Sequence, residues 1–223
     1  MQGRREILVD RDAGYAYVAV PKAARNSIRE AIAARLGVNT PWDETLRPFL
    51  VHPSMARGLH GVVRWTVVRN PFDRLRSCWA DKCTLPRRDL RSGLSFRKME
   101  GWTFERFVLR VCALETREMD VHFVPQYELL RYRKVRIVDE IYRLDQLGSV
   151  WPRLMERWGL PELGISNRGP DVSVDWSDEM VEAVLSRFGD DFERFGFCAV
   201  PSNRLSRAKE VAGGCGETSG SAG

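Results

Sequence analysis

Blocks of apolar residues alternate along the chain with polar stretches, and their periods predict strands and helices in turn. The run Y-A-Y-V-A-V at 15–20 is rich in β-forming residues and lies between Gly14 and Pro21, which predicts a strand. A helix is expected to begin near Ser27, because apolar residues then recur at helical spacing until Gly37, a residue type that commonly ends helices. The first unit is therefore a strand that runs into a helix.

The same alternation continues toward the C-terminus. The segment R-W-T-V-V-R-N at 64–70 predicts a second strand, and Asn70-Pro71 supplies an N-cap and a first-turn proline for a helix. We also expect helices near 103–114, near 145–158 and from Ser177, a short strand at 135–138, and irregular chain at 38–63 and 82–101. This order predicts an α/β domain, a P-loop-like three-layer fold with a mostly parallel central sheet flanked by helices.

Composition and charge indicate a globular protein suited to an anionic ligand. The 223 residues are 43% hydrophobic and 29% charged, which is typical of a folded domain rather than of a disordered chain. We expect one domain over 1–200, followed by a disordered tail at 201–223 that is poor in large apolar residues. The net charge of +5 suits an anionic substrate or cofactor and is also compatible with nucleic acid.

The sequence carries no strong membrane, disulfide or metal signal. No apolar run of about 18 residues predicts a membrane span, and the N-terminus lacks the apolar core of a signal peptide. The five cysteines are scattered and form no C-x-x-C pair, which favours reduced thiols in a cytoplasmic protein. Cys78 and Cys83 have no neighbouring partner for a metal ion, so no metal site is expected.

The first candidate for chemistry is the loop P-K-A-A-R-N-S at 21–27, where the first strand becomes a helix. Ligands of α/β sheets bind at the carboxyl ends of the strands, where helix N-termini point. Loop amides would bind an oxyanion, Lys22 would add a positive charge and Ser27 a hydroxyl. The loop lacks the G-x-x-x-x-G-K-[ST] pattern of a Walker loop, and taken alone it fits an ordinary turn with a surface lysine better than a phosphate site.

The second candidate is the segment V-V-R-N-P-F-D-R-L-R-S-C-W-A-D-K at 67–82. Arg69 ends a strand and Ser77 lies two turns into the following helix, so both side chains could converge on one phosphate. Alternatively, Arg69 pairs with a carboxylate and Ser77 is a small residue in a packed helix.

Taken together, the two segments resemble a known family. P-K-A-A-R-N-S-I is similar to the 5′-phosphosulfate loop, and V-R-N-P-F-D-R-L-R-S-C-W to the 3′-phosphate motif, of sulfotransferases that use PAPS (3′-phosphoadenosine 5′-phosphosulfate). Three later segments resemble the carbohydrate-type, family 2-like branch: H-F-V-P-Q at 122–126, D-E-I-Y-R-L-D-Q-L at 139–147 and D-D-F-E-R-F-G-F at 190–197. The matches follow the family order from about residue 15 to residue 197.

The resemblance implies an enzyme that transfers a sulfuryl group from PAPS, without a metal, to a hydroxyl or amine of a carbohydrate or other small metabolite. Lys22 would stabilise charge on the bridging oxygen of an in-line, loose transition state. The implied donor-binding residues are Lys22, Ala23, Ala24, Arg25, Asn26, Ser27, Ile28, Arg69 and Ser77.

Two positions depart from the family pattern. Arg25-Asn26 stands where a small residue and then threonine or serine are more usual, so Arg25 either contacts the phosphosulfate or points to solvent. Asn70 replaces a more usual aspartate, a change of small consequence because both residues cap helices.

An acceptor hydroxyl requires a general base, and the chain contains only three histidines. His52 is the first candidate, because related enzymes place a base or an acceptor-binding residue in this part of the chain. His122 is the second, because it begins H-F-V-P-Q, where it could instead organise the acceptor wall. His60 is expected on a loop surface, and the carboxylates Asp43 and Glu44 are further alternatives.

The loop at 82–101 is strongly basic. It is either a solvated charged loop or a lid that binds an anionic acceptor such as a glycan. Its basic residues include Arg87, Arg88, Arg91, Arg97 and Lys98.

Three other functions compete with the sulfotransferase prediction. A nucleotide or small-molecule kinase would need a full Walker ending and a magnesium-binding carboxylate, where this chain has Arg69-Asn70. A nucleic-acid-binding module would need exposed stacking aromatics, whereas many aromatics here lie on apolar helix stripes, so no nucleic-acid partner is expected. A degenerate protein that binds PAPS or its product PAP without catalysis is the third, because of Arg25. The sequence predicts no oligomeric state.

Overall fold

A five-stranded sheet forms the centre of the protein, with the strand order β3-β1-β2-β4-β7. The computed structural model describes residues 6–38, 44–84, 99–164, 172–201 and 204. The strands are β1 (Ile7–Asp10), β2 (Tyr15–Val18), β3 (Leu50–Val51), β4 (Val63–Val68) and β7 (Glu140–Arg143).

Most strands of this sheet run in one direction. β2 pairs with β4 and β4 with β7 in parallel, whereas β1 runs antiparallel to β2 and β3. Only β1 is therefore reversed, and the predicted mostly parallel sheet is confirmed. The sequence patterns did not predict β1, because its short run I-L-V-D directly follows charged residues and shows no alternation, although all four residues are buried.

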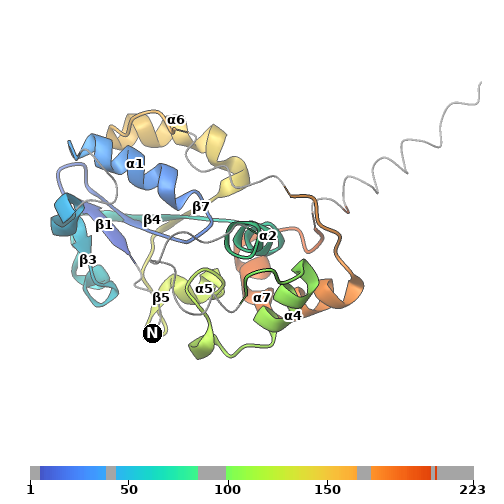
Figure 1. Ribbon diagram of the computed structural model, residues 1–223. Helices are drawn as coiled ribbons and strands as arrows, with labels where there is room; N and C mark the ends of the chain where they lie inside the picture. Colours follow the sequence, from blue (N-terminus) through green and yellow to red (C-terminus); the bar gives the residue numbers. More distant parts are fainter. Residues whose placement is uncertain (1–5, 39–43, 85–98, 165–171, 202–203, 205–223) are drawn as a thin grey trace, which may run out of the picture.

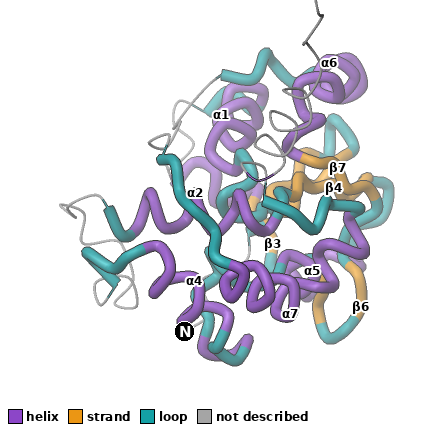
Figure 2. The backbone as a smooth tube through the Cα atoms, turned by 90° about the vertical axis from the view of Figure 1, so that its right-hand side faces the viewer, coloured by secondary structure: helices purple, strands orange, loops and turns teal. Residues whose placement is uncertain are grey.

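Helices cover both faces of the sheet. Figures 1 and 2 show α1 and α6 on one side of the strands and α5 and α7 on the other. The helices are α1 (Arg25–Arg35), α2 (Pro71–Lys82), α4 (Phe104–Cys112), α5 (Gln126–Leu129), α6 (Leu147–Trp158) and α7 (Asp178–Phe195). Short 3₁₀ helices include η1 (Glu44–Phe49), η2 (Pro53–Gly58), η3 (Thr116–Glu118) and η4 (Leu144–Gln146).

The predicted helix boundaries agree well with the structure where a capping residue marks them. Asn70 caps α2, since its side chain accepts a hydrogen bond from the backbone N–H of Phe72, and Pro71 opens the helix. Ser177 caps α7 in the same way through Met180. α1 begins at Arg25, earlier than the predicted Ser27.

The strand predicted at 135–138 forms only in part and belongs to a different sheet. β6 (Val135–Arg136) pairs with β5 (Arg131–Tyr132) in a separate hairpin. Arg133 and Lys134 between them both have positive φ angles of 47° and 66°, the conformation that closes a two-residue hairpin turn. The remaining parallel strand of the main sheet is β7, which lies within the segment that resembles the family at 139–147.

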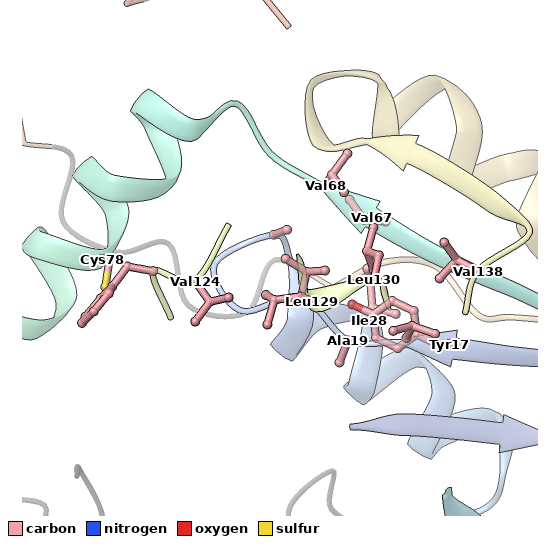
Figure 3. Close-up of a cluster of buried hydrophobic side chains, with 14 of the residues drawn as sticks. Tyr17, Ala19, Ile28, Val67, Val68, Cys78, Val124, Leu129, Leu130 and Val138 are labelled. Atoms are coloured by element: carbon pink, nitrogen blue, oxygen red, sulfur yellow. The ribbon is translucent and has the colours of Figure 1, made fainter. Parts of the chain in front are cut away.

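The core joins the sheet to helices on both faces. On the side of α6, Trp65 of β4 stacks on Trp158 with ring centroids 5.2 Å apart and packs against Tyr17 of β2 at 4.8 Å. Figure 3 shows a further buried cluster that extends from Tyr17 and Val67 of the sheet to Cys78 of α2. The carboxyl ends of β2 and β4 therefore stand on a continuous apolar core.

Several sequence predictions concern absences or the chain ends. None of the helices in the described residues is long and apolar enough to cross a membrane. Within the same residues, no three His, Cys, Asp or Glu side chains come together as a metal site would require. Of the predicted tail at 201–223, all but residues 201 and 204 lie outside the described residues.

Candidate functional site

The first junction, residues 19–24, connects β2 to α1 and has an unusual backbone. Lys22 and Ala24 adopt positive φ angles of 67° and 57°, in the left-handed region that favours glycine. Left-handed residues within a loop turn neighbouring backbone N–H groups toward one side, which is the geometry of an anion-binding nest. The sequence offered no glycine to signal this conformation, so it was not predicted.

The first turn of α1 continues the same site. Arg25, Asn26 and Ser27 form this turn, which contains no acidic residue, so the positive end of the helix dipole is uncompensated by a side chain of that turn. Ala24 at the N-cap has no polar side chain to cap the helix. Ile28, the last residue of the predicted donor-binding loop, differs from these three residues. Its side chain is buried in the core, and its backbone N–H donates to the Ala24 carbonyl at 3.0 Å within the helix.

Lys22 points from the first junction toward α2. Its ammonium Nζ lies 2.9 Å from Oδ2 of Asp81, which also lies 3.1 Å from Nζ of Lys82. Burial raises the pKa of Asp81, but the two lysines outweigh it and hold the pKa below its usual value. Asp81 is therefore ionised at neutral pH and holds the charge of Lys22 beside the first junction.

The second junction, residues 69–70 between β4 and α2, touches the first directly. The Arg69 guanidinium donates to the carbonyl oxygen of Lys22 at 3.1 Å. Burial lowers the pKa of Arg69, although Asp73 opposes the shift. Within the described part of the chain, Arg69 forms no ion pair with a carboxylate. The two segments that resemble phosphate-binding motifs thus meet at one place.

Arg74 of α2 also binds the first junction, and its role was not foreseen from the sequence. The side chain is 2% exposed, and Nε donates to the Pro21 carbonyl at 3.1 Å. The two terminal nitrogens donate to the carbonyls of Val124 at 2.8 Å and Val121 at 3.3 Å. Burial lowers the pKa of Arg74 to about 10, so the guanidinium stays charged at neutral pH. The only sequence signal was the arginine within F-D-R-L-R-S.

Ser77 lies on the face of α2 that turns toward the first junction. It sits one turn after Arg74, which binds Pro21, and one turn before Asp81, which binds Lys22. Residues three and four apart share a helix face, so the Ser77 side chain lies between these two contacts. Arg69 therefore contacts Lys22, and Ser77 shares the helix face whose other residues contact the first junction; their common role at a phosphate stays a prediction.

A buried network holds the second junction in place. Gln126 is fully buried; its side-chain oxygen accepts from the Arg69 N–H at 2.8 Å, and its Nε2 donates to the Arg69 carbonyl at 2.7 Å. Asp191 of α7, also fully buried, accepts from the backbone N–H groups of Gln126 and Tyr127 at 2.8 and 2.7 Å. Burial raises the pKa of Asp191, while these N–H donors oppose the shift. Gln126 and Asp191 explain why the segments at 122–126 and 190–197 accompany the phosphate motifs.

The end of the 190–197 segment closes over the carboxyl ends of β4 and β7. Asn70 donates from its side-chain Nδ2 to the Cys198 carbonyl at 3.2 Å, in addition to capping α2. Arg143 at the end of β7 donates to the Gly196 carbonyl at 2.6 Å, and its guanidinium lies 4.8 Å from the ring centroid of Phe197. The predicted equivalence of Asn70 and aspartate is therefore incomplete, because an aspartate has no donor for Cys198.

His122 lies beside the first junction. Its Nδ1 is 2.6 Å from Oδ1 of Asp120, and the same oxygen accepts from the His122 backbone N–H at 3.0 Å. Burial lowers the pKa of His122, Asp120 opposes this, and the nearby charges of Lys82 and Arg25 lower it further. A half-buried imidazole paired with a carboxylate is an arrangement found in general bases.

His52 occupies a different environment. It is exposed and caps η2, with Nδ1 2.8 Å from Oγ of Ser54 and 3.3 Å from the Ser54 backbone nitrogen. Val51 and Val18 both pair with Ile7, so His52 lies at the same edge of the sheet as the first junction, two strands away from β2. His60 is exposed, as predicted.

Other sequence predictions fall outside what the structure describes. Asp43 and the basic residues of the 82–101 loop, Arg87, Arg88, Arg91, Arg97 and Lys98, lie outside the described residues, and the side chain of Glu44 is also not described.

Comparison with known proteins gives one result. The family model described as Sulfotransferase family matches residues 5–198. Comparisons with curated proteins and with solved structures gave no match. Because the family model spans most of the sequence, the chain belongs to the sulfotransferase family, and sulfuryl transfer is the general activity that this membership supports.

Proposed function

We propose that this member of the sulfotransferase family transfers the sulfuryl group of PAPS to a hydroxyl or amine of a carbohydrate or other small metabolite. The observation that carries the proposal is the contact between Arg69 and the Lys22 carbonyl, which joins the two anion-binding junctions. The Arg69 side chain is half-buried, and within the described residues no carboxylate forms an ion pair with it. A guanidinium held in this way is well suited to bind a phosphate through charge-assisted hydrogen bonds.

In this proposal each junction binds one end of the donor. Arg69 and Ser77 bind the 3′-phosphate, and the first junction with the first turn of α1 binds the phosphosulfate through backbone N–H groups. Arg25 in that turn is half-buried and near His122, which favours a role at the donor rather than in solvent.

Lys22 is proposed as the main catalytic cation. Sulfuryl transfer in line with the departing bridging oxygen requires positive charge where that oxygen becomes negative. Lys22 is tethered by its carbonyl to Arg69 and by its ammonium to Asp81, so its position is defined from both ends. No step of this chemistry requires a metal ion.

Calorimetric binding of PAP (adenosine 3′,5′-bisphosphate) tests the donor site. We expect wild type to bind PAP without magnesium and Arg69→Ala to weaken binding by about 10- to 100-fold, because a charged hydrogen bond is lost. Arg153→Ala, an exposed arginine of α6, is the matched control and should leave affinity unchanged. Binding of ATP that requires magnesium, with no binding of PAP, would instead support a kinase.

Sulfuryl transfer itself is tested with ³⁵S-labelled PAPS and a panel of carbohydrate and small-molecule acceptors. Lys22→Ala should lower turnover by about 100-fold or more, the usual cost of removing a group that stabilises transition-state charge. Lys134→Ala, an exposed lysine in the β5–β6 turn, is the control. PAP binding without turnover on any acceptor or on water would favour a protein that only binds the nucleotide.

A further inference from the structure

The assignment of the general base can be sharpened from the segment 120–126, on the assumption that the proposed function is correct. The Arg74 side chain ties this segment to the first junction. Arg74 donates to the carbonyls of Val121 and Val124, which flank His122, and to that of Pro21, which precedes Lys22. No comparable contact ties the exposed His52 to the first junction in the described part of the chain.

The protonation of the His122 ring follows from its partner. Burial raises the pKa of Asp120, but the hydrogen bonds that it accepts from the His122 ring and backbone, helped by the charge of Lys82, outweigh it and hold the pKa below its usual value. An ionised carboxylate can only accept hydrogen bonds. The 2.6 Å contact therefore requires the ring proton on Nδ1, which places the lone pair of the neutral imidazole on Nε2.

We infer that Asp120 is a positioning residue of the sulfuryl transfer, which fixes the His122 tautomer so that Nε2 accepts the proton of the acceptor hydroxyl. In the reaction, the acceptor oxygen bonds to the sulfur of PAPS while the bond from sulfur to the bridging oxygen breaks. PAP leaves with that electron pair, and the acceptor proton moves to Nε2. The Asp120 carboxylate then stabilises the imidazolium that forms.

The charges around His122 determine its pH behaviour. Asp120 favours the imidazolium, whereas Lys82 from the end of α2 and Arg25 from the start of α1 disfavour it. Burial acts in the same direction as the two cations. The ring is thus kept neutral, as a base must be before reaction, and the carboxylate supplies its stabilisation afterwards.

The ring protons can be observed without any acceptor. Because the chain has only three histidines, a long-range ¹H–¹⁵N spectrum should show three imidazoles, assigned with His52→Asn, His60→Asn and His122→Asn. We expect wild-type His122 to carry its proton on Nδ1 and to titrate below the ordinary histidine value. Asp120→Asn should move that titration to still lower pH. A proton on Nε2 in wild type would overturn the inference.

The catalytic consequence is measured by PAPS turnover as a function of pH, with the best acceptor of the panel or with water. Asp120→Asn should lower kcat by about 10- to 100-fold, with an unchanged KM for PAPS and an acid limb shifted to lower pH. Asp120→Glu should restore part of the rate, and Asp12→Asn, in the exposed turn between β1 and β2, is the control.

Two outcomes would contradict the inference, and a third separates it from the proposed function. An unchanged pH profile in Asp120→Asn, or turnover that survives His122→Asn but not His52→Asn, would assign the base elsewhere. In both cases wild type would still bind PAP. Failure of wild type to bind PAP would instead refute the donor site on which the inference rests.

Discussion

The two junctions at the carboxyl edge of the sheet meet at the same place but are built by different means. The first junction depends on backbone conformation: Lys22 and Ala24 are left-handed, and no side chain caps the helix that follows. The second depends on side chains: Asn70 caps α2, and Gln126 holds both backbone groups of Arg69. The proposed anion site would thus combine a strained loop with a rigid, hydrogen-bonded support.

The segment 120–126 connects the two junctions. His122 lies near Arg25 at the first junction, and Gln126 binds Arg69 at the second. Arg74 joins the same segment to Pro21. Changes in this support should therefore affect both junctions, whereas changes within one junction should have local effects.

The largest effect is expected from removing the support of the second junction. Asp191→Ala leaves the buried N–H groups of Gln126 and Tyr127 without an acceptor, so we expect a loss of about 3 kcal/mol or more in the free energy of unfolding. Urea denaturation measures it. Asp190→Ala, whose carboxyl is exposed, should change stability by less than about 0.5 kcal/mol. Equal values for the two variants would show that the network does not stabilise the fold.

A moderate effect is expected where Lys22 meets α2. Asp81→Asn removes the carboxylate that holds the Lys22 ammonium beside the first junction, so PAP and PAPS should bind about fivefold more weakly. The expected change in affinity is small because Asp81 is partly exposed, which weakens its interaction with Lys22. Calorimetry with PAP measures the change, and Asp145→Asn, a surface carboxylate, is the control. Tighter binding by Asp81→Asn would mean that Asp81 competes with the donor for Lys22 instead of positioning it.

A smaller effect is expected from replacing Asn70 at the second junction with aspartate, the more usual residue of the family at this position. Asn70→Asp keeps the cap of α2 but loses the donor to the Cys198 carbonyl and turns a carboxylate toward it, at a cost of about 1 kcal/mol. Thermal unfolding measures the loss. Asn70→Ser, which also caps helices, separates the two roles because it removes the amide without adding charge. A fully stable Asn70→Asp would show that the Cys198 contact contributes nothing.

The smallest effect should come from the backbone of the first junction. Ala24→Gly removes the strain of a left-handed alanine at φ 57°, so we expect a gain of roughly 0.5 kcal/mol in stability. Ala34→Gly, at an exposed position within the same helix, should have the opposite sign and cost about 1 kcal/mol. The same urea experiment compares them. Destabilisation by Ala24→Gly would indicate that the loop is not strained.

Much of the fold was predictable because its signals are local. Helix caps such as Asn70 and Ser177 were read correctly because a cap involves residues two or three apart. The short strand β1 and the pairing of β6 within a hairpin were not predicted, although their partners are close in sequence, because these short runs show no clear alternation of apolar and polar residues.

The site was predictable to a similar extent. Lys22, Arg69 and Ser77 were proposed from motifs; the structure places Arg69 in contact with Lys22, and the role of the three residues in donor binding stays a prediction. Arg74, Asp120 and Asp191 were missed, because their roles consist of hydrogen bonds to backbone groups 47 or more residues away or of a local pairing with one histidine. Cytoplasmic location, a disordered tail and the identity of the acceptor remain predictions.

The sequence by itself determined most of the helices, the strands β2 and β4, the family and the two segments that resemble phosphate motifs, since each is encoded within short, continuous segments. Only the tertiary structure decided how these segments cooperate. The Arg69–Lys22 contact, the buried Gln126–Asp191 support and the His122–Asp120 pair within reach of Arg25 arise when the sheet places distant segments at one edge. Once buried there, polar groups must find partners in space, and spacing along the chain does not record which partners those are.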